Sequence, residues 1–473
     1  MHRLTSVVAL LLVVAGAVPA SAGPPTTSGR AATAEAAANV RADFNNDGFA
    51  DLAVGAPGED AGSVVDAGAV NVLYGGGGRL SGAGSQLFTQ VGSAAEPGDF
   101  FGAAVAAGDF NGDGYADLAV GAPFEDGVGT ADVGAVSVLY GSTGGLGTAG
   151  GRLFTQVGSA AESGDVFGYA LSAGDFNHDG VADLAAGAPL EDASSIVDAG
   201  AVSVLYGSAG GLGTAGGRLF TQVGSAAEPG DGFGARVAAG DFDNDGYADL
   251  AVGAPYEDAG TIPVAGAVSV LYGAAGGLST AGGRLFTQIG AVERYDQFGD
   301  ALTAGDFNND GFADLAAGAP VEDVNAIGDA GAVSVLYGSA AGITATGART
   351  FTQVGSAAEA GDYFGWALAT GDFDNDGFAD LAAGAEGEDV YSATDAGAVS
   401  VLYGSSAGVT TAAGQIFTQD TPGVGSSAEP GDFFGLGLAA GAAEPTAVSV
   451  GTSSNQGSSN QGSSGVGRTA RHR

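Results

Sequence analysis

The chain contains no cysteine, and all 13 of its basic residues are arginines, so it contains no lysine either. No disulfide can therefore hold the fold together, and neither a thiolate nor a lysine amine is available as a nucleophile. Two of the three histidines lie at the ends of the sequence, as His2 and His472, and the third is His178 in a loop rich in Asp and Asn. The nucleophile–base arrangements of common hydrolases are absent, and we predict that the chain is not an enzyme.

Positive charge is scarce throughout. The chain has 54 acidic residues against 13 basic ones, and its formal net charge is −41. Such a charge repels phosphates and anionic lipids, so it argues against nucleic acid or an anionic membrane as a partner. Proline is also scarce, with 14 residues, while the 89 glycines recur in phase with a long repeat. This composition is typical of a turn-rich repeat protein and not of a disordered chain.

An apolar run occurs at the N-terminus. Arg3 precedes the run Val7–Val18, and Ala-Ser-Ala at 20–22 offers a small-residue cleavage site. This pattern predicts a signal peptide at residues 1–22, because the run is too short for a membrane-spanning helix. The alternative is an N-terminal strand buried in the fold. We therefore expect a secreted protein, located outside the cell or at its surface, with no membrane insertion.

Two segments differ in composition from the repeats between them. Residues 23–38 are rich in Pro, Thr, Ser and Ala, and they predict a flexible linker. Residues 444–473 are rich in Ser, Gly, Asn and Gln, and they predict a disordered tail. The repeats occupy residues 39–443, which we interpret as the folded domain.

One nonapeptide occurs six times in this domain. Positions 1, 3, 5 and 9 are Asp, Asn or Asp, Asp and Asp in every copy, and position 6 is Gly, where the chain needs a sharp turn. Clusters of Asp, Asn and Gly also form ordinary turns, but six copies that keep four oxygen-bearing side chains in register indicate metal loops. The copies lie 65 or 66 residues apart and begin at Asp43, Asp109, Asp175, Asp241, Asp306 and Asp372.

The spacing of these oxygen-bearing residues favours Ca²⁺. This ion takes six to eight oxygen ligands, whereas Mg²⁺ keeps several of its waters and takes fewer protein ligands. The pattern resembles the first half of an EF-hand loop without the Glu at position 12. We therefore expect the Asp at position 9 to bind with both oxygens, and position 7, whose side chain varies, to contribute its carbonyl oxygen. The predicted ligands, for up to six Ca²⁺ ions, are Asp43, Asn45, Asp47, Phe49, Asp51, Asp109, Asn111, Asp113, Tyr115, Asp117, Asp175, Asn177, Asp179, Val181, Asp183, Asp241, Asp243, Asp245, Tyr247, Asp249, Asp306, Asn308, Asp310, Phe312, Asp314, Asp372, Asp374, Asp376, Phe378 and Asp380.

Each period contains four strand-like runs, which we name A to D. In the second period they are 101–110, 117–122, 135–140 and 152–157, separated by turn residues, and no amphipathic helix is recognisable. Four strands at this interval predict an all-β fold, a β-propeller of four-stranded antiparallel blades. Six blades are expected; seven would need another set of strands. The first period has only a stub of strand A, and we predict that Phe434–Ala440 completes the N-terminal blade and closes the ring.

A Phe-Gly pair begins each strand A, and Gly-Ala-Pro follows most of the loops, as in Phe101-Gly102 and Gly121–Pro123. With the metal loop between them, these residues resemble the FG-GAP repeat of integrin alpha subunits over residues 39–443. The resemblance implies a propeller with Ca²⁺ between the first two strands of a blade, at the positions given above. Integrin propellers have seven blades with metal in only some, and the other integrin segments have no counterpart here. A secreted bacterial FG-GAP protein is the closer likeness, and a heterodimeric receptor is not implied.

Most acidic residues outside the metal loops fall on one predicted face. In an up-and-down blade, the B–C and D–A connections lie on the face opposite the A–B loops. Each B–C connection carries a Glu-Asp pair, such as Glu59-Asp60, and each D–A connection carries a Glu and an Asp, such as Glu96 and Asp99. We call this the acidic face. Its acids either keep the protein soluble or bind a cationic partner or further Ca²⁺.

These features together predict a secreted, calcium-binding propeller that acts as an adhesion or extracellular recognition module. We expect a monomer whose partner is an unknown extracellular protein or polysaccharide. The alternative is a secreted hydrolase or its non-catalytic accessory domain, which a unique acid pair on one face would favour; a structural surface protein is a third possibility. Trp366, the only tryptophan, is expected to pack in the core and not to serve as a sugar platform.

Overall fold

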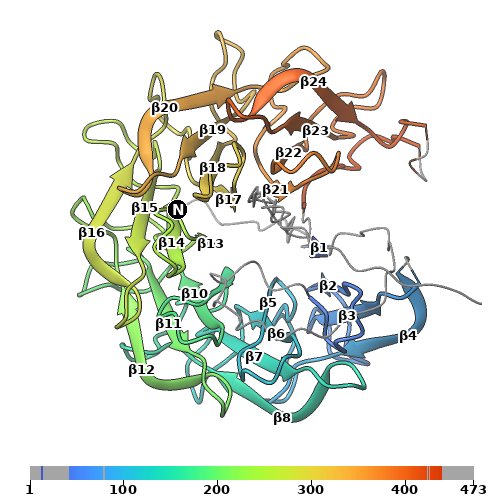
Figure 1. Ribbon diagram of the computed structural model, residues 1–473, viewed down its shortest axis with the longest axis vertical. Helices are drawn as coiled ribbons and strands as arrows, with labels where there is room; N and C mark the ends of the chain where they lie inside the picture. The colour runs from blue at the N-terminus through green and yellow to red at the C-terminus, as the bar shows by residue number, and fades with distance from the viewer. Residues whose placement is uncertain (1–11, 14–41, 78–79, 423, 425–426, 439–473) are drawn as a thin grey trace, which may run out of the picture.

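The computed structural model describes residues 12–13, 42–77, 80–422, 424 and 427–438. All regular elements in these residues are strands, which form six separate four-stranded antiparallel sheets arranged around a common centre (Figure 1). The six-bladed β-propeller predicted from the sequence is therefore confirmed. In the described part of the chain, no helix is long and apolar enough to cross a membrane. Apart from residues 12–13, the predicted signal peptide, linker and tail lie outside the described residues.

The strands of each blade follow the chain from the centre of the ring to its rim (Figure 1). The innermost strands, A, are β1 (Leu12–Val13), β5 (Ala104–Gly108), β9 (Leu171–Gly174), β13 (Arg236–Gly240), β17 (Ala301–Gly305) and β21 (Leu368–Gly371). The B strands are β2 (Leu52–Ala56), β6 (Asp117–Ala122), β10 (Asp183–Ala188), β14 (Asp249–Ala254), β18 (Asp314–Ala319) and β22 (Asp380–Ala385).

The outer half of each blade is built from strands C and D. The C strands are β3 (Ala69–Tyr74), β7 (Ala135–Tyr140), β11 (Ala201–Tyr206), β15 (Ala267–Tyr272), β19 (Ala332–Tyr337) and β23 (Ala398–Tyr403). The D strands are β4 (Ser81–Phe88), β8 (Gly147–Phe154), β12 (Gly213–Phe220), β16 (Ser279–Phe286), β20 (Thr344–Phe351) and β24 (Thr410–Phe417). Strand β8 begins earlier than the predicted 152–157, because residues without apolar alternation still pair with β7 through an irregular register near Tyr140.

The hydrophobic cores lie between neighbouring blades. The B strand is buried along its whole length in five blades, because both of its faces pack against a neighbouring sheet. Glycine allows the closest approach: a Cβ on Gly121 would lie 2.1 Å from the carbonyl oxygen of Gly168 in the next blade. The Phe-Gly and Gly-Ala pairs of the repeat therefore form the contact between successive blades. The Phe before this glycine, such as Phe167, is fully buried there.

The predicted closure of the ring is wrong in the described residues. The inner position of the first blade is held by β1, with Leu12 opposite Val54 and Val13 opposite Ala53. Residues 434–438 form turns instead of a strand, and 439–440 lie outside the described residues. Phe434 donates its N–H to the carbonyl of Ala396 at 2.9 Å and packs on the sixth blade. This is the contact that each Phe-Gly pair of the repeat makes with the blade before it.

Candidate metal centres

The six nonapeptides form the A–B loops, which all lie on the face of the ring opposite the acidic face. Position 4 of each loop has a positive φ of 52–69°, and it is Asn, Gly or, in the third loop, the exposed His178. Asn, His and Gly tolerate this left-handed conformation better than most residues. The Gly at position 6, such as Gly114 with a φ of 89°, makes the second tight bend. The backbone thus curls around the side chains of positions 1, 3 and 5.

Hydrogen bonds hold these side chains turned into the loop. In the second loop, the two oxygens of Asp109 accept the N–H groups of Asp113 and Gly114, at 3.1 and 2.8 Å. Asn111 Oδ1 accepts the N–H of Asp113 at 2.8 Å, and Asp113 Oδ1 accepts the N–H of Tyr115 at 3.0 Å. The bonds made by positions 1 and 5 recur in all six loops. The oxygens are therefore positioned by the fold itself.

The Asp at position 9 has a role that the sequence interpretation missed. Asp117 is fully buried at the start of β6, where Oδ2 accepts the N–H of Phe110 at 2.9 Å and Oδ1 accepts the N–H of Gly141 at 2.8 Å. Gly141 follows β7, so this one carboxylate ties the metal loop to the C–D turn. The same pair of bonds occurs in all six blades. The sequence signal was the Tyr-Gly pair that ends every C strand.

Burial makes the negative charge of this Asp costly. Loss of solvent is the largest effect and raises the pKa of Asp117 to about 7 and the pKa of Asp183 to about 8. The neighbouring carboxylates of Asp109 and Asp113 raise the pKa of Asp117 further, and its two backbone hydrogen bonds only partly offset both effects. A bound dication would favour the ionised form and remove this repulsion. The electrostatics of the loops therefore fit a cation.

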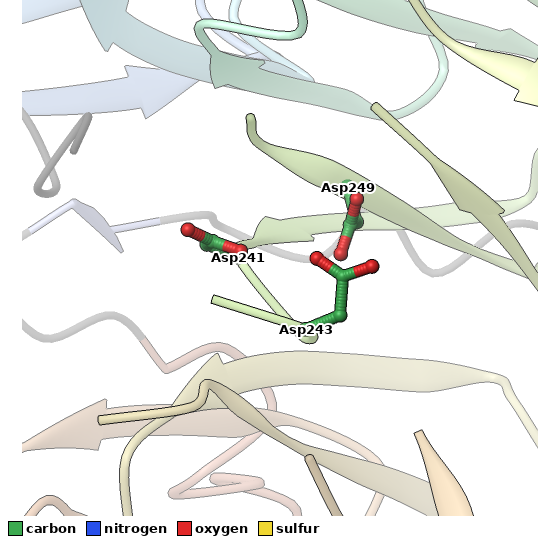
Figure 2. A group of neighbouring side chains, drawn as sticks. All are labelled: Asp241, Asp243 and Asp249. Carbon is green, nitrogen blue, oxygen red and sulfur yellow. The ribbon is translucent and has the colours of Figure 1, made fainter. Parts of the chain in front are cut away.

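The fourth and sixth loops bring three carboxylates together. Asp241, Asp243 and Asp249 each place a carboxylate oxygen within 4.8 Å of the other two. Figure 2 shows the carboxylates of Asp243 and Asp249 pointing toward one another, with Asp241 beside them. Asp243 Oδ1 is buried and has no hydrogen-bond partner among the described residues. Asp372, Asp374 and Asp380 also have carboxylate oxygens within 4.8 Å of one another, but Asp374 is exposed.

The remaining predicted ligands are placed as follows. The first, second, third and fifth loops have Asn at position 3, and its Oδ1 accepts the N–H of position 5. The Asp at position 5 is exposed in these four loops and carries a backbone hydrogen bond from position 7. Positions 1, 3 and 9 in two loops thus form groups that could hold a metal ion, while the assignment to Ca²⁺ and the number of ions stay predictions.

Many carboxylates of the acidic face also hold the fold together. Asp60 accepts the N–H of Asp66 at 3.0 Å, and Asp99 accepts the N–H of Glu96 at 2.6 Å. Glu125 is buried against Asp99, and burial raises the pKa of Asp99 to about 7, with the Glu125 charge adding to the shift. Several acids of this face thus stabilise the loops in every blade, while others, such as Glu59 and Glu96, are exposed.

Large apolar side chains are exposed on the same face. The side chains of Val128 and Tyr391 are almost fully exposed to solvent. Trp366 is half-buried, with its ring 6.1 Å from that of Tyr363, so it does not pack in the core as expected. The exposed apolar residues of the B–C and D–A connections are Val65, Val128, Val197, Tyr256, Tyr295, Tyr391 and Phe433. These side chains are spread over several blades and differ from one blade to the next.

A known repeat family matches this chain once in each blade. The FG-GAP repeat model matches residues 37–73, 101–139, 167–205, 233–271, 298–336 and 364–402, once in each blade. Integrin alpha-V of Gallus gallus is 32% identical over 251 residues, which cover 50% of this chain and 22% of that protein. Phosphatidylinositol-glycan-specific phospholipase D of Bos taurus is 34% identical over 156 residues, which cover 32% of this chain and 18% of that protein.

The chain thus spans less than a quarter of the length of either relative. Among solved structures, rhamnogalacturonan lyase YesW aligns with 80% of this chain and 69% of its own, at 13% identity and a TM-score of 0.37.

Proposed function

The chain is an FG-GAP repeat protein with one repeat in each blade, and from this we propose that it is a secreted, calcium-stabilised module that recognises an extracellular ligand through its acidic face. The observation that carries the proposal is the contrast between the two faces. The metal loops repeat the same hydrogen bonds six times, whereas the residue after Gly-Ala-Pro and the exposed apolar side chains differ from blade to blade on the other face. Variable, partly apolar loops on a rigid scaffold are where binding sites occur.

Calcium has a structural part in this proposal. The residues at positions 1, 3, 5 and 9, with the carbonyl of position 7, would hold Ca²⁺ at the corner between strands A and B. The ion would neutralise carboxylates that burial and mutual repulsion destabilise, in a fold that has no disulfide. The proposed secretion would suit this role, because extracellular Ca²⁺ is plentiful enough to fill sites of modest affinity.

The absence of cysteine allows a direct test of the acidic face. We would introduce a single cysteine at Val128 or Tyr391 on this face, or at Ala209 on the metal-loop face, and attach a polyethylene glycol maleimide. Binding of each labelled protein to collagen, fibrinogen, chitin, cellulose and mannan is then measured in Ca²⁺. Labels at Val128 or Tyr391 should block binding, while a label at Ala209 should not. Blocking only from Ala209, or binding to none of the five polymers, would count against the proposal.

A second candidate is a secreted hydrolase or its non-catalytic accessory domain. Two observations favour it: one relative is by its name a phospholipase, and one pair of acids, Asp300 and Glu386, has no equivalent in the other blades. Release of soluble products from any of the five polymers by the purified protein would support hydrolysis. Loss of that release in Asp300→Ala would assign it to this pair.

A further inference from the structure

Five side chains break the repeat at one place on the acidic face. Tyr169, Arg236 and Asp300 lie at or just before the starts of β9, β13 and β17, and Tyr256 and Glu386 follow the ends of β14 and β22. The innermost strands surround the centre of the ring (Figure 1). The second blade has alanine where Arg236 and Asp300 stand, at Ala104 and Ala103, and proline where Glu386 stands, at Pro123. The repeated architecture does not need these five residues.

The cluster is held together across blades. Arg236 Nη2 lies 3.1 Å from Asp300 Oδ1, Nη1 donates to the carbonyl of Ala235 at 2.9 Å, and the guanidinium lies 5.7 Å from the centre of the Tyr169 ring. Asp300 is almost fully buried, whereas about a third of the Arg236 side chain is exposed. Burial, and then the charge of Asp300, raise the pKa of Tyr256. Arg236 therefore keeps further N–H donors beside the Tyr169 ring, on a side chain that is partly exposed.

Within the part of the chain that the structure describes, the carboxyl group of Glu386 lacks a hydrogen-bond partner for one of its oxygens. Its Oε2 is buried and has no hydrogen-bond partner among the described residues. Burial, and then the charge of Asp300, raise the pKa of Glu386 to about 7, so its carboxyl can donate as well as accept near neutral pH. A buried carboxyl oxygen without a partner is costly, and a ligand that supplies a hydroxyl group would remove the cost.

We propose that Tyr169, Arg236, Tyr256, Asp300 and Glu386 form a single binding site for a neutral sugar unit of a polysaccharide. The inference rests on the proposed recognition function and names its ligand class. Tyrosine rings offer apolar faces that suit the C–H face of a sugar ring, and a guanidinium and a carboxyl suit neighbouring hydroxyl groups.

Charge selects against acidic sugars. The chain has a formal net charge of −41, and the acidic face carries paired carboxylates in every B–C connection. Uronate or sulfate groups would be repelled by this surface, whereas hydroxyl groups would not. The positive charge of Arg236 does not make the site attract acidic sugars, because Asp300 already neutralises that charge. The ligand is therefore an uncharged sugar unit.

The repeat itself supplies variants that should fold. Glu386→Pro, and the double change Arg236→Ala with Asp300→Ala, replace each residue by the one found at the same position in other blades. The double change removes both partners of the ion pair, so it leaves no buried charge unpaired. Leu87→Thr is the matched control, because the exposed Leu87 lies on β4 at the rim and the fifth blade has Thr350 at that position.

Binding is measured by calorimetry with the full chain in saturating Ca²⁺. The probes are cellohexaose, maltohexaose, laminarihexaose, mannohexaose and, as the charged comparison, hexagalacturonate. We expect at least one neutral hexasaccharide to bind and its affinity to fall about tenfold or more in both repeat-matched variants, with Leu87→Thr unchanged. Equal affinity in the variants and the native chain, or preference for hexagalacturonate, would overturn the site. Binding to collagen or fibrinogen without any hexasaccharide would overturn it too, while leaving the recognition function standing.

Discussion

At the scale of the residue, the Asp at position 9 of each loop combines two roles. Its carboxylate accepts one N–H from its own loop and one from the C–D turn, and it also belongs to the predicted metal sites. Position 5, by contrast, is exposed, and in the second loop it accepts only local hydrogen bonds, from the N–H of Tyr115 and from Nδ2 of Asn111. Position 9 thus stabilises the blade with or without metal, whereas position 5 serves mainly the predicted metal site.

Substitutions at these two positions should separate the roles. In EGTA, Asp117→Ala leaves two N–H groups without their acceptor, and we expect it to lower the free energy of unfolding by about 2–4 kcal/mol. Asp113→Ala should cost less than about 1 kcal/mol in EGTA, because its bond is exposed. In Ca²⁺, both should lose the stabilisation from that site. Urea unfolding followed by tryptophan fluorescence measures all four values. Equal losses for the two variants in EGTA would contradict the structural role of position 9.

At the scale of the element, the contacts between blades decide which glycines are replaceable. A Cβ on Gly121 of β6 would meet the Gly168 carbonyl oxygen at 2.1 Å, whereas a Cβ on Gly150 of β8 would meet no atom within 4 Å. Gly121→Ala therefore requires the neighbouring blade to move, and Gly150→Ala has only the strain of its φ of 79°. We expect Gly121→Ala to lower the free energy of unfolding by about 3 kcal/mol or more, and Gly150→Ala to lower it by about 1 kcal/mol. Thermal unfolding checks the order, and similar melting temperatures would contradict the close packing.

The buried acid pairs of the acidic face should make stability depend on pH. Burial raises the pKa of Asp165 and of Asp231 to about 7, and the adjacent Glu191 and Glu257 add to it. A raised carboxyl pKa favours the protonated folded state, so the stabilisation is present below about pH 4 and disappears as the pH rises through 7.

The melting temperature, measured in saturating Ca²⁺ from pH 5 to pH 8, should therefore decrease as the pH rises to about 7. This decrease should add to any change that other titrating groups cause. Asp165→Asn with Asp231→Asn keeps the oxygen that accepts a backbone N–H and should flatten this fall. The exposed Glu96→Gln serves as the control. A fall of the same size in the double Asn variant would show that other groups control the pH dependence.

At the scale of the whole molecule, the repeat carries most of what the sequence could predict. Each nonapeptide marks one blade, so six copies predict six blades, and the bounds of β6 and β7 agree with the predicted runs. The cluster around Arg236 could not be predicted, because it joins residues of four blades that meet only when the ring forms. The closure was predicted wrongly because the Phe434-Gly435 pair also serves the sixth blade, and the sequence does not show which strand then fills the first.

Calcium should determine the stability of the ring as a whole. Each site that binds only the folded chain stabilises it by about 2.7 kcal/mol at a hundredfold excess of Ca²⁺ over its Kd. We expect EGTA to lower the melting temperature sharply and added Ca²⁺ to restore it. Mg²⁺ at the same concentration should restore little, since it keeps several of its waters and takes fewer protein oxygens. Differential scanning calorimetry on the native chain measures this, with Asp241→Asn/Asp372→Asn as the variant expected to lose two sites. A melting curve unchanged by EGTA would rule out the calcium sites.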